Sequence, residues 1–409
     1  MFCNIIKPST GLQIIRNVRL LRNISKTSAI LNNENITKYM SRPPKNFNSR
    51  TFSTINGTIA PTTSSNLVTK EEIKEFMSVF PDLLRDIRDH NMFEDLHYVK
   101  DRITKCLEYN VPLGKKSRGL ITLSSYKLLE SPEKLTSENI RLAQILGWCV
   151  ELLHSSFLIN DDIIDSAETR RGLPCWYLVE GIHALNDALF IENGLYLLLK
   201  KYFHDHHCYV PTIELFHKTT AKTSLGETLD VLSTKNGKPQ FDYFTVNNYN
   251  CIVNCKTAYY SLHLPLALAM YLAGKYDPEM HRHVSTISLE IGHFFQVQDD
   301  FLDCFGDSSK MGKNNTDIVN GKCSWLAVQA LQRASLEQRI IFEQNYGKTN
   351  LGSVAIIRSL YEDLDLPNVY AVYEEETCNL IRSHIQQVPQ GLPHRLYFNI
   401  LEGFYRRSS

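Results

Sequence analysis

The chain has 409 residues, 43% of them hydrophobic, and its 44 basic side chains balance its 44 acidic ones. This apolar content is sufficient for a large core and excludes a wholly disordered protein. Because residues 1–70 hold ten Lys or Arg and one acid, the remainder is acidic by nine charges, which argues against nucleic-acid binding through a basic face.

The N-terminal segment differs in kind from the rest of the chain. Residues 1–33 contain five Lys or Arg and no acid, and Ile, Leu and Val are interleaved with these cations at helical spacing. An acid-poor, arginine-bearing amphipathic segment is typical of a mitochondrial transit peptide. We therefore predict a transit peptide over 1–52, a flexible linker over 53–70 and one main domain over 71–409. The alternative is a cytoplasmic protein with an unstructured basic extension.

From residue 71 onward the sequence predicts helices nearly throughout. Residues 137–165 place apolar side chains at the i, i+3, i+4, i+7 positions of one buried face, and Ser137 is a plausible N-cap. Residues 259–272 and 284–302 are similarly long and apolar. Period-two alternation is scarce, so we predict an all-α fold, a single large helical bundle. The longest strongly apolar run, 264–273, is too short to cross a bilayer, so we expect no transmembrane segment.

Two carboxylate clusters share one spacing. They are Asp161, Asp162 and Asp165 in the first cluster and Asp299, Asp300 and Asp303 in the second. At about 100° per residue, the first and last members fall about 40° apart on one helix face. Buried carboxylates are costly unless a multivalent cation holds them, and oxygen-only ligands suit Mg²⁺. Two opposed clusters could hold metal ions on either side of a diphosphate.

A single cluster of this kind is more often a solvated helix face. Here both clusters follow strongly apolar stretches, 157–160 and 294–297, where a solvated face is not expected. Arg170 and Arg171 follow the first cluster, and Lys313 and Lys322 follow the second. Acids for a metal with Arg and Lys for phosphate oxygens favour a metal-bridged diphosphate site.

The chain resembles the farnesyl-diphosphate-synthase type of trans-prenyltransferase over nearly all of residues 75–407. Besides the two aspartate clusters, the resemblance rests on shorter motifs in the same order: Gly114-Lys-x-x-Arg118-Gly119, Gly147-Trp-Cys-Val-Glu-Leu-Leu153, Thr169-Arg-Arg-Gly172, Gly226-Glu-Thr-Leu-Asp230, Lys256-Thr-Ala-Tyr259, Phe294-Phe-Gln-Val-Gln298 and Lys322-Cys-Ser-Trp325. It implies an isoprenoid-synthase fold around a deep central cavity, usually as a homodimer. It also implies an enzyme that joins dimethylallyl or geranyl diphosphate to isopentenyl diphosphate, with 71–409 as its catalytic domain.

The resemblance also implies roles for individual residues. The metal ligands would be Asp161, Asp165 and Asp299, holding about three Mg²⁺ ions, with Mn²⁺ or Co²⁺ as other possible metals. The isopentenyl diphosphate would be held by Gly114, Lys115, Arg118, His154 and Arg171. The allylic diphosphate would be held by Arg170, Lys256, Thr257, Gln296, Lys313 and Lys322, with Lys256, Thr257 and Gln296 as the catalytic groups. Product length would be set by Ser156 and Phe157.

Departures from the family pattern leave alternatives open. Ser156 opens space where an aromatic residue is common and Phe157 retains bulk, which implies products of about ten to fifteen carbons. A terpene synthase of the same fold would ionise farnesyl or geranyl diphosphate without condensation, but it would be expected to lose isopentenyl contacts, whereas Lys115, Arg118 and Arg171 remain. A catalytically inactive partner subunit is disfavoured because both aspartate clusters are complete.

Two other patterns are less informative. The sequence His204-Asp-His-His-Cys208 has metal-ligand chemistry, but it lies between predicted helices without a second cluster, and closed zinc sites need four convergent ligands. The ten cysteines include no CxxC pair, so we expect buried thiols in a reducing compartment, with Cys251 and Cys255 in the core.

Overall fold

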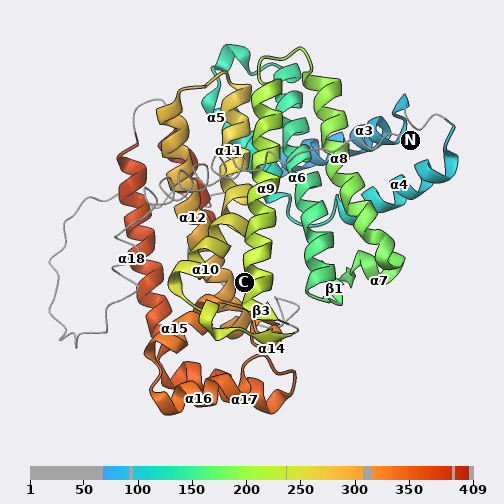
Figure 1. The fold of residues 1–409 in the computed structure, drawn as a ribbon. Coiled ribbons are helices and arrows are strands. Elements are labelled where there is room, and N and C mark those ends of the chain that lie inside the picture. Colours follow the sequence, from blue (N-terminus) through green and yellow to red (C-terminus); the bar gives the residue numbers. More distant parts are fainter. Residues whose placement is uncertain (1–67, 92–94, 236, 307–315, 389–391, 405–409) are drawn as a thin grey trace, which may run out of the picture. The chain divides into compact units, whose positions relative to one another are not determined.

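Helices make up nearly all regular structure of residues 68–404, which a computed structural model describes apart from residues 92–94, 236, 307–315 and 389–391 (Figure 1). These residues belong to one unit that spans Pro61–Ser409. Within this described part the only strands are four two-residue strands in two antiparallel hairpins. The predicted all-α fold is therefore confirmed.

The elements follow one another with short connections. The helices are α3 (Lys70–Arg88), α4 (His97–Asn110), α5 (Ser117–Leu129), α6 (Ser137–Ile164), α7 (Trp176–Glu180), α8 (Ala184–Phe203), α9 (Tyr209–Ser233), α10 (Val246–Ile252), the π-helix η6 (Val253–His263), α11 (Leu264–Leu272), α12 (Pro278–Phe305), α14 (Thr316–Asn320), α15 (Trp325–Arg333), α16 (Leu336–Asn345), α17 (Leu351–Asp363), α18 (Leu366–Gln386) and α19 (His394–Phe404). The 3₁₀ turns are η3 (Pro132–Lys134), η4 (Gly181–His183) and η5 (Phe241–Tyr243). The hairpins pair β1 (Thr169–Arg170) with β2 (Leu173–Pro174) and β3 (Thr234–Lys235) with β4 (Lys238–Pro239). The predicted transit peptide, most of the linker and Lys313 lie outside the described residues.

Helix α6 is the central element of the core. Its N-cap is Thr136, whose hydroxyl accepts from the Asn139 amide, so the expected N-cap at Ser137 is wrong by one residue. Among the described residues, α6 alone is long and apolar enough to cross a membrane by length and composition. However, 83% of its most apolar stretch is buried inside the protein, as in the core helix of a folded domain.

The helices around α6 form a layered bundle. Helix α6 packs against α5 and α8, α11 packs against α5, and α12 packs against α18. The helices α6, α8, α9, α11 and α12 stand side by side in Figure 1. Their facing sides bury a continuous apolar core, which includes the large aromatic rings of Trp148, Phe203 and Phe294.

The π-helix η6 interrupts what the sequence predicts as an uninterrupted helix over 259–272. It contacts both α9 and α12 at glycines. A Cβ added at Gly226 of α9 would lie 2.2 Å from the Lys256 amide nitrogen, and one at Gly292 of α12 would lie 2.5 Å from the Ala258 Cβ. Only glycine permits this approach, so α9 and α12 pack tightly against the segment that carries Lys256 and Thr257. Isolated π-helical turns often occur at functional sites.

Three long helices end in acidic residues at the same region of the structure. Helix α6 ends beside Asp161 and Asp165, α9 ends beside Asp230, and α12 ends beside Asp299 and Asp303. None of the three has a basic residue in its last turn. The negative end of a helix dipole disfavours carboxylates, so these ends require cations from elsewhere.

Candidate active site

Two lysines bind the carboxylates at the ends of α6 and α9. The Lys256 Nζ lies 2.7 Å from an oxygen of Asp230 and 3.1 Å from one of Asp161. The Lys322 Nζ lies 2.6 Å from Asp165 and 2.9 Å from the same oxygen of Asp230. Asp230 is therefore the shared partner that joins α9, η6 and the end of α6 into one charged cluster.

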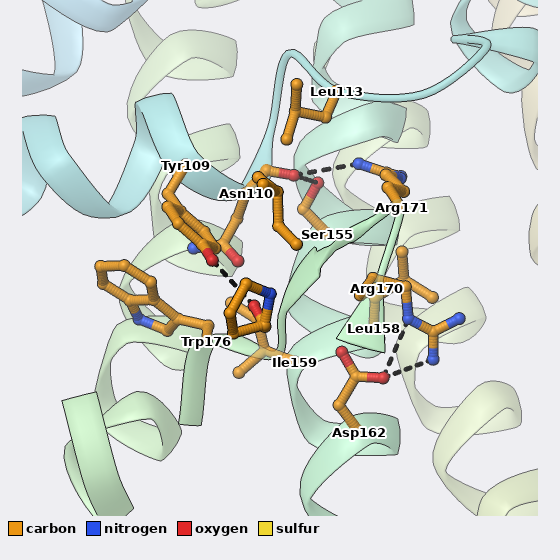
Figure 2. A pocket seen from close by; sticks show the side chains of 12 residues that line it. Tyr109, Asn110, Leu113, Ser155, Leu158, Ile159, Asp162, Arg170, Arg171 and Trp176 are labelled. Atoms are coloured by element: carbon orange, nitrogen blue, oxygen red, sulfur yellow. Dashed lines mark hydrogen bonds and ion pairs between the residues drawn. The ribbon is translucent and has the colours of Figure 1, made fainter. Parts of the chain in front are cut away.

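The hairpin after α6 adds Arg170 to this cluster. The turn residues Arg171 and Gly172 both have positive φ, 55° and 78°, which is the geometry of a tight hairpin turn. Arg170 donates to Asp161 at 3.0 Å and, through Nε, to Asp162 at 2.9 Å. Arg171 points the other way and donates to the Asn110 carbonyl at 3.1 Å, as Figure 2 shows. The two adjacent arginines thus bind different parts of the structure, Arg170 the carboxylates of α6 and Arg171 the end of α4.

Electrostatics keep the cluster ionised. Burial alone would raise the pKa of the Asp161 carboxyl, but Lys256 and Arg170 beside it hold that pKa below its ordinary value. Burial opposes Lys256 and Lys322 at Asp230 as well, yet the two ammonium groups lower its pKa to about 2. Burial would lower the pKa of Lys256, whereas Asp230 and Asp161 hold it well above its ordinary value. Charged acids and charged lysines therefore coexist here at neutral pH.

The second aspartate cluster has two members in structural contacts. Asp300 is buried and accepts from the Tyr249 hydroxyl and the Trp325 amide, both at 2.8 Å, and from Gln296 at 2.9 Å. Asp303 accepts from the Thr316 hydroxyl at 2.6 Å. These contacts fix the end of α12 against α10, α14 and α15, and they give Gln296 a protein partner in the structure.

A metal site is expected at this cluster. Among the described residues, no three His, Cys, Asp or Glu side chains come close enough together to hold a metal ion. The oxygens of Asp161 and Asp165 are instead paired with basic groups, and both side chains remain about one fifth exposed (23% and 22%). Five carboxylates, including Asp162, Glu227 and Asp230, face only three cations, so carboxylates outnumber cations, and burial raises the pKa of Asp162 and of Glu227. The donor set therefore fits a hard divalent cation.

Arg118 and His154 meet on the α5 side of α6. Arg118 donates to the Ser261 hydroxyl at 2.7 Å and to the Tyr260 hydroxyl at 3.1 Å, and its guanidinium carbon lies 4.6 Å from the centre of the Tyr260 ring. One His154 ring nitrogen lies 3.3 Å from Arg118 and the other 3.2 Å from the Tyr260 hydroxyl. Burial and the Arg118 charge lower the pKa of His154 well below its ordinary value, so its ring is neutral and can accept from Arg118.

A small pocket opens beside the hairpin (Figure 2). It is lined by the end of α4, by α6 and by both hairpin arginines, and the Tyr109 hydroxyl closes one side by donating to the Pro174 carbonyl at 2.8 Å. The loop before α5 lies next to it. Gly114 has a φ of 92°, and a Cβ there would lie 2.8 Å from the Arg171 Nε, so this loop is packed against Arg171. Lys115, the next residue, is exposed.

The two expected chain-length residues differ in their surroundings. Ser156 is buried and donates to the carbonyl of Leu153 in its own helix at 2.8 Å. Phe157 packs edge-on against the Tyr260 ring, with 5.3 Å between the ring centres. Phe157 therefore contacts the same tyrosine that binds Arg118.

The structure brings together most of the residues expected from the sequence. Lys256, Lys322 and Arg170 surround Asp161 and Asp165, while Thr257 lies beside Lys256 in η6 and Gln296 binds Asp300. Lys313 lies outside the described residues. Sequence reasoning gave no role to Asp230, Glu227, Lys116 or Glu151. Asp230 and Glu227, three residues apart on one face of α9, could have been noticed from their spacing.

Two secondary expectations have clear outcomes. His204–Cys208 lies between α8 and α9, where His206 contacts the Cys208 sulfur at 3.0 Å and His207 contacts the Tyr276 hydroxyl at 2.5 Å. The expected burial of the thiols holds for most of the described cysteines, but Cys251 is exposed and Cys255 is only partly buried. The prediction that these two lie in the core is wrong for Cys251, which is exposed near the end of α10, and Cys255 in η6 is only partly buried.

Comparisons with known proteins agree with this arrangement. A family model described as polyprenyl synthetase matches residues 100–364. The chain is 45% identical to farnesyl pyrophosphate synthase of Murgantia histrionica over 94% of its own length and 93% of the relative. It is 46% identical to the protein of that name in Nezara viridula, over 83% of this chain and 84% of the relative, and 41% identical to the one in Bos taurus, over 82% and 96%.

Proposed function

The chain belongs to the polyprenyl synthetase family as a prenyltransferase of short-chain isoprenyl diphosphate synthesis, and from this premise we propose its substrates, site residues, metal, assembly and location. Its reaction is the condensation of dimethylallyl and geranyl diphosphate with isopentenyl diphosphate, which gives geranyl and farnesyl diphosphate for isoprenoid biosynthesis. The observation that carries this proposal is the pairing of the lysine–carboxylate cluster with a second group of cations across α6.

The allylic diphosphate is assigned to the cluster of Lys256, Lys322 and Arg170. The reaction begins when the C–O bond of this substrate breaks and its electron pair stays with the departing diphosphate. Fixed cations stabilise the negative charge that develops on that leaving group. Asp230 also pairs with Lys256 and Lys322, and Asp162 also pairs with Arg170, so the three cations keep a carboxylate partner when Asp161 and Asp165 hold the metal. Thr257, next to Lys256, is assigned to face the developing allyl cation.

The isopentenyl diphosphate is assigned to Arg118, Arg171, Lys115 and His154. A new C–C bond forms between its double bond and the allyl cation, and a proton then leaves. The released diphosphate can accept that proton, so no protein base is required. Burial of the surrounding helices excludes water, which would otherwise capture the cation.

We infer that Mg²⁺ is held by Asp161, Asp165 and Asp299. When bound, Mg²⁺ neutralises charge on the diphosphate and strengthens its role as a leaving group. The excess of carboxylates over cations around Asp161 and Asp165 supports this assignment, because the diphosphate would bring still more negative charge to the site.

A homodimer is supported by an apolar surface on α8 and α9. Leu185 and Leu189 lie one turn apart on α8, and Leu225 and Leu232 lie two turns apart on α9; all four are exposed. The two helices pack against each other. Exposed apolar patches of this kind mark association surfaces. Analytical ultracentrifugation tests this inference: a dimer is expected, which Leu189→Glu should dissociate, and a wild-type monomer would contradict it.

The assay that tests the function supplies the purified chain, full length or beginning at Ser53, with geranyl diphosphate, Mg²⁺ and either isopentenyl diphosphate or none. We expect farnesyl diphosphate only when isopentenyl diphosphate is present. Hydrocarbon or alcohol products from farnesyl diphosphate alone, without elongation, would contradict the proposal and favour a terpene synthase.

A further inference from the structure

A lysine is buried inside the loop that precedes α5. This loop, residues 111–116, connects α4 to α5 and includes Gly114 and Lys115. The side chain of Lys116 is only 2% exposed, and its ion-pair partner Glu151, on α6, is equally buried. Lys116 has a φ of 51°, a conformation that non-glycine residues seldom adopt. A charged side chain in this position needs a physical explanation.

Lys116 ties both ends of the loop to one point on α6. Its Nζ donates to the Val111 carbonyl, where α4 ends, at 2.5 Å, and lies 3.3 Å from one oxygen of Glu151. The other Glu151 oxygen accepts from the Gly119 amide, in the first turn of α5, at 2.9 Å. The Trp148 ring lies under the ammonium, at 5.9 Å from its centre.

This anchored loop lies next to cations that would contact a diphosphate. Gly114 is packed against Arg171, Lys115 follows Gly114 in the loop, and Arg118 lies two residues beyond the loop in the first turn of α5. Burial and the charges of Arg171 and Arg118 together lower the pKa of Lys116 to about 8, although Glu151 opposes this. Lys116 is therefore close enough to both arginines to interact with their charges.

Stability alone does not account for this lysine. A buried ion pair is often no more stabilising than well-packed apolar residues of the same volume, because both charges must be desolvated. An apolar side chain would fill the space beside Trp148, but it would supply no donor to the Val111 carbonyl and no partner to Glu151. The specific contribution of Lys116 is thus the position of the loop.

We propose that Lys116 is a positioning residue for isopentenyl diphosphate: by joining Val111 to Glu151, it fixes the loop so that Lys115, Arg118 and Arg171 converge on one diphosphate. This inference rests on the proposed function. Lys116 does not itself touch the substrate, because its ammonium is enclosed by the Val111 carbonyl, Glu151 and Trp148.

The test compares Lys116→Met with Lys127→Met. Lys127 is also on α5 and is paired with Glu72 at 2.7 Å, away from the site, so its replacement controls for the loss of one lysine from this helix. In Lys116→Met, KM for isopentenyl diphosphate should rise about tenfold or more, the scale of one lost buried hydrogen-bond partner. KM for geranyl diphosphate should stay close to the wild-type value, and both should be unchanged in Lys127→Met. Equal changes in the two KM values would overturn the inference.

A second variant distinguishes the positioning of the loop by Lys116 from its neutralisation of the buried Glu151 charge. Lys116→Met leaves Glu151 buried without its partner, so it should lower the melting temperature. The double variant Lys116→Met with Glu151→Gln removes that unpaired charge and retains an acceptor for the Gly119 amide. It should recover much of the melting temperature while KM for isopentenyl diphosphate stays raised. If the single variant does not fold, the double variant provides the same comparison of KM values.

The outcomes are distinguishable. A wild-type KM in the double variant would show that Lys116 only neutralises Glu151, and it would overturn the inference while the proposed function stands. If the wild-type chain itself fails to elongate geranyl diphosphate, the proposed function fails first, and the inference fails with it.

Discussion

Asp230 is the residue on which the charged cluster depends, although it belongs to neither aspartate cluster. One of its oxygens accepts from both Lys256 and Lys322, and its pKa of about 2 reflects those two contacts. The lysines are thereby held at fixed positions, each also in contact with an aspartate of α6. At the scale of single residues, the site consists of preset ion pairs that a diphosphate can join.

Removing a carboxylate assigned to the metal should stop turnover without unfolding the protein. Asp161→Ala or Asp299→Ala should lower kcat by about 100-fold or more, because each would remove a ligand that stabilises the leaving group. The circular dichroism spectrum should be unchanged, because Lys256 and Arg170 each keep a second carboxylate partner, Asp230 and Asp162, when Asp161 is removed. The matched control is Asp82→Ala, which removes an exposed aspartate paired with Arg85 and Arg141. Near-normal turnover in either test variant would contradict the assigned roles.

Phe157 should limit product length. Phe157→Ala removes the ring that packs on Tyr260 and should lengthen the main product by about one five-carbon unit, because a Phe side chain fills a comparable volume. The opposite change, Ser156→Phe, should shorten it. Mass spectrometry of the hydrolysed products measures both. An unchanged spectrum in Phe157→Ala would place the limit elsewhere in the cavity.

The residue scale also shows what spacing can and cannot predict. The shared face of Asp161 and Asp165 follows from the helical repeat, so it could be inferred from the sequence. The partners of Asp230 depend on how α9 packs against η6, and the Lys116–Glu151 pair joins residues 35 positions apart. Such contacts are set by tertiary packing and leave no local pattern. The segment Gly226–Asp230 was one of the motifs behind the family resemblance, but its spacing did not reveal that Asp230 binds both lysines.

At the scale of elements, the π-helix η6 connects packing to chemistry. It interrupts the helix expected over 259–272, and the close approach of α9 and α12 at two glycines determines its position. Gly226 and Gly292 can be recognised in the sequence as glycines within helices. The sequence does not reveal, however, which neighbouring element packs into the space that a Cβ would fill. The packing of these glycines therefore sets where the Lys256 ammonium lies.

Gly226→Ala should force helix α9 and the π-helix η6 apart. The new Cβ would lie 2.2 Å from the Lys256 amide, so α9 or η6 must shift, at a cost of roughly 1–3 kcal/mol or more of stability. Turnover should fall as well, because Lys256 moves relative to Asp161. Denaturant unfolding and steady-state kinetics measure the two effects.

The control for this substitution is Gly403→Ala, which makes the same change in another helix, α19. No atom lies within 4 Å of a Cβ added at Gly403, so this change should leave turnover unaltered and alter stability by no more than about 1 kcal/mol, the difference in helix propensity. Equal behaviour of the two variants would mean that the α9–η6 contact has no special role.

At the scale of the whole molecule, the fold class followed from hydrophobic periodicity, since long helices with one apolar face have few other ways to bury it. Domain boundaries at the N-terminus remain a prediction, because residues 1–67 lie outside the described structure. The argument for mitochondrial import is the acid-poor, basic and amphipathic sequence of that segment.

Import can be tested with residues 1–60 fused to a fluorescent protein. We expect mitochondrial fluorescence and a fusion shortened by about fifty residues on a gel, as for a cleaved amphipathic leader. The control carries Arg16→Glu, Arg19→Glu and Arg22→Glu, which reverse the charge of the segment and should abolish import. A diffuse signal without a size change from the unaltered fusion would identify the segment as a cytoplasmic extension.

The acidic ends of α6, α9 and α12 have a consequence for engineering. A programme that selects variants only for heat resistance should favour Asp165→Asn, because an amide removes the charge at the negative end of α6 while its oxygen can still accept from Lys322. The same variant should be inactive if Asp165 is a metal ligand. Thermal selection and catalytic selection would therefore diverge at this helix end, and libraries intended to make the enzyme more robust should leave Asp165 unchanged.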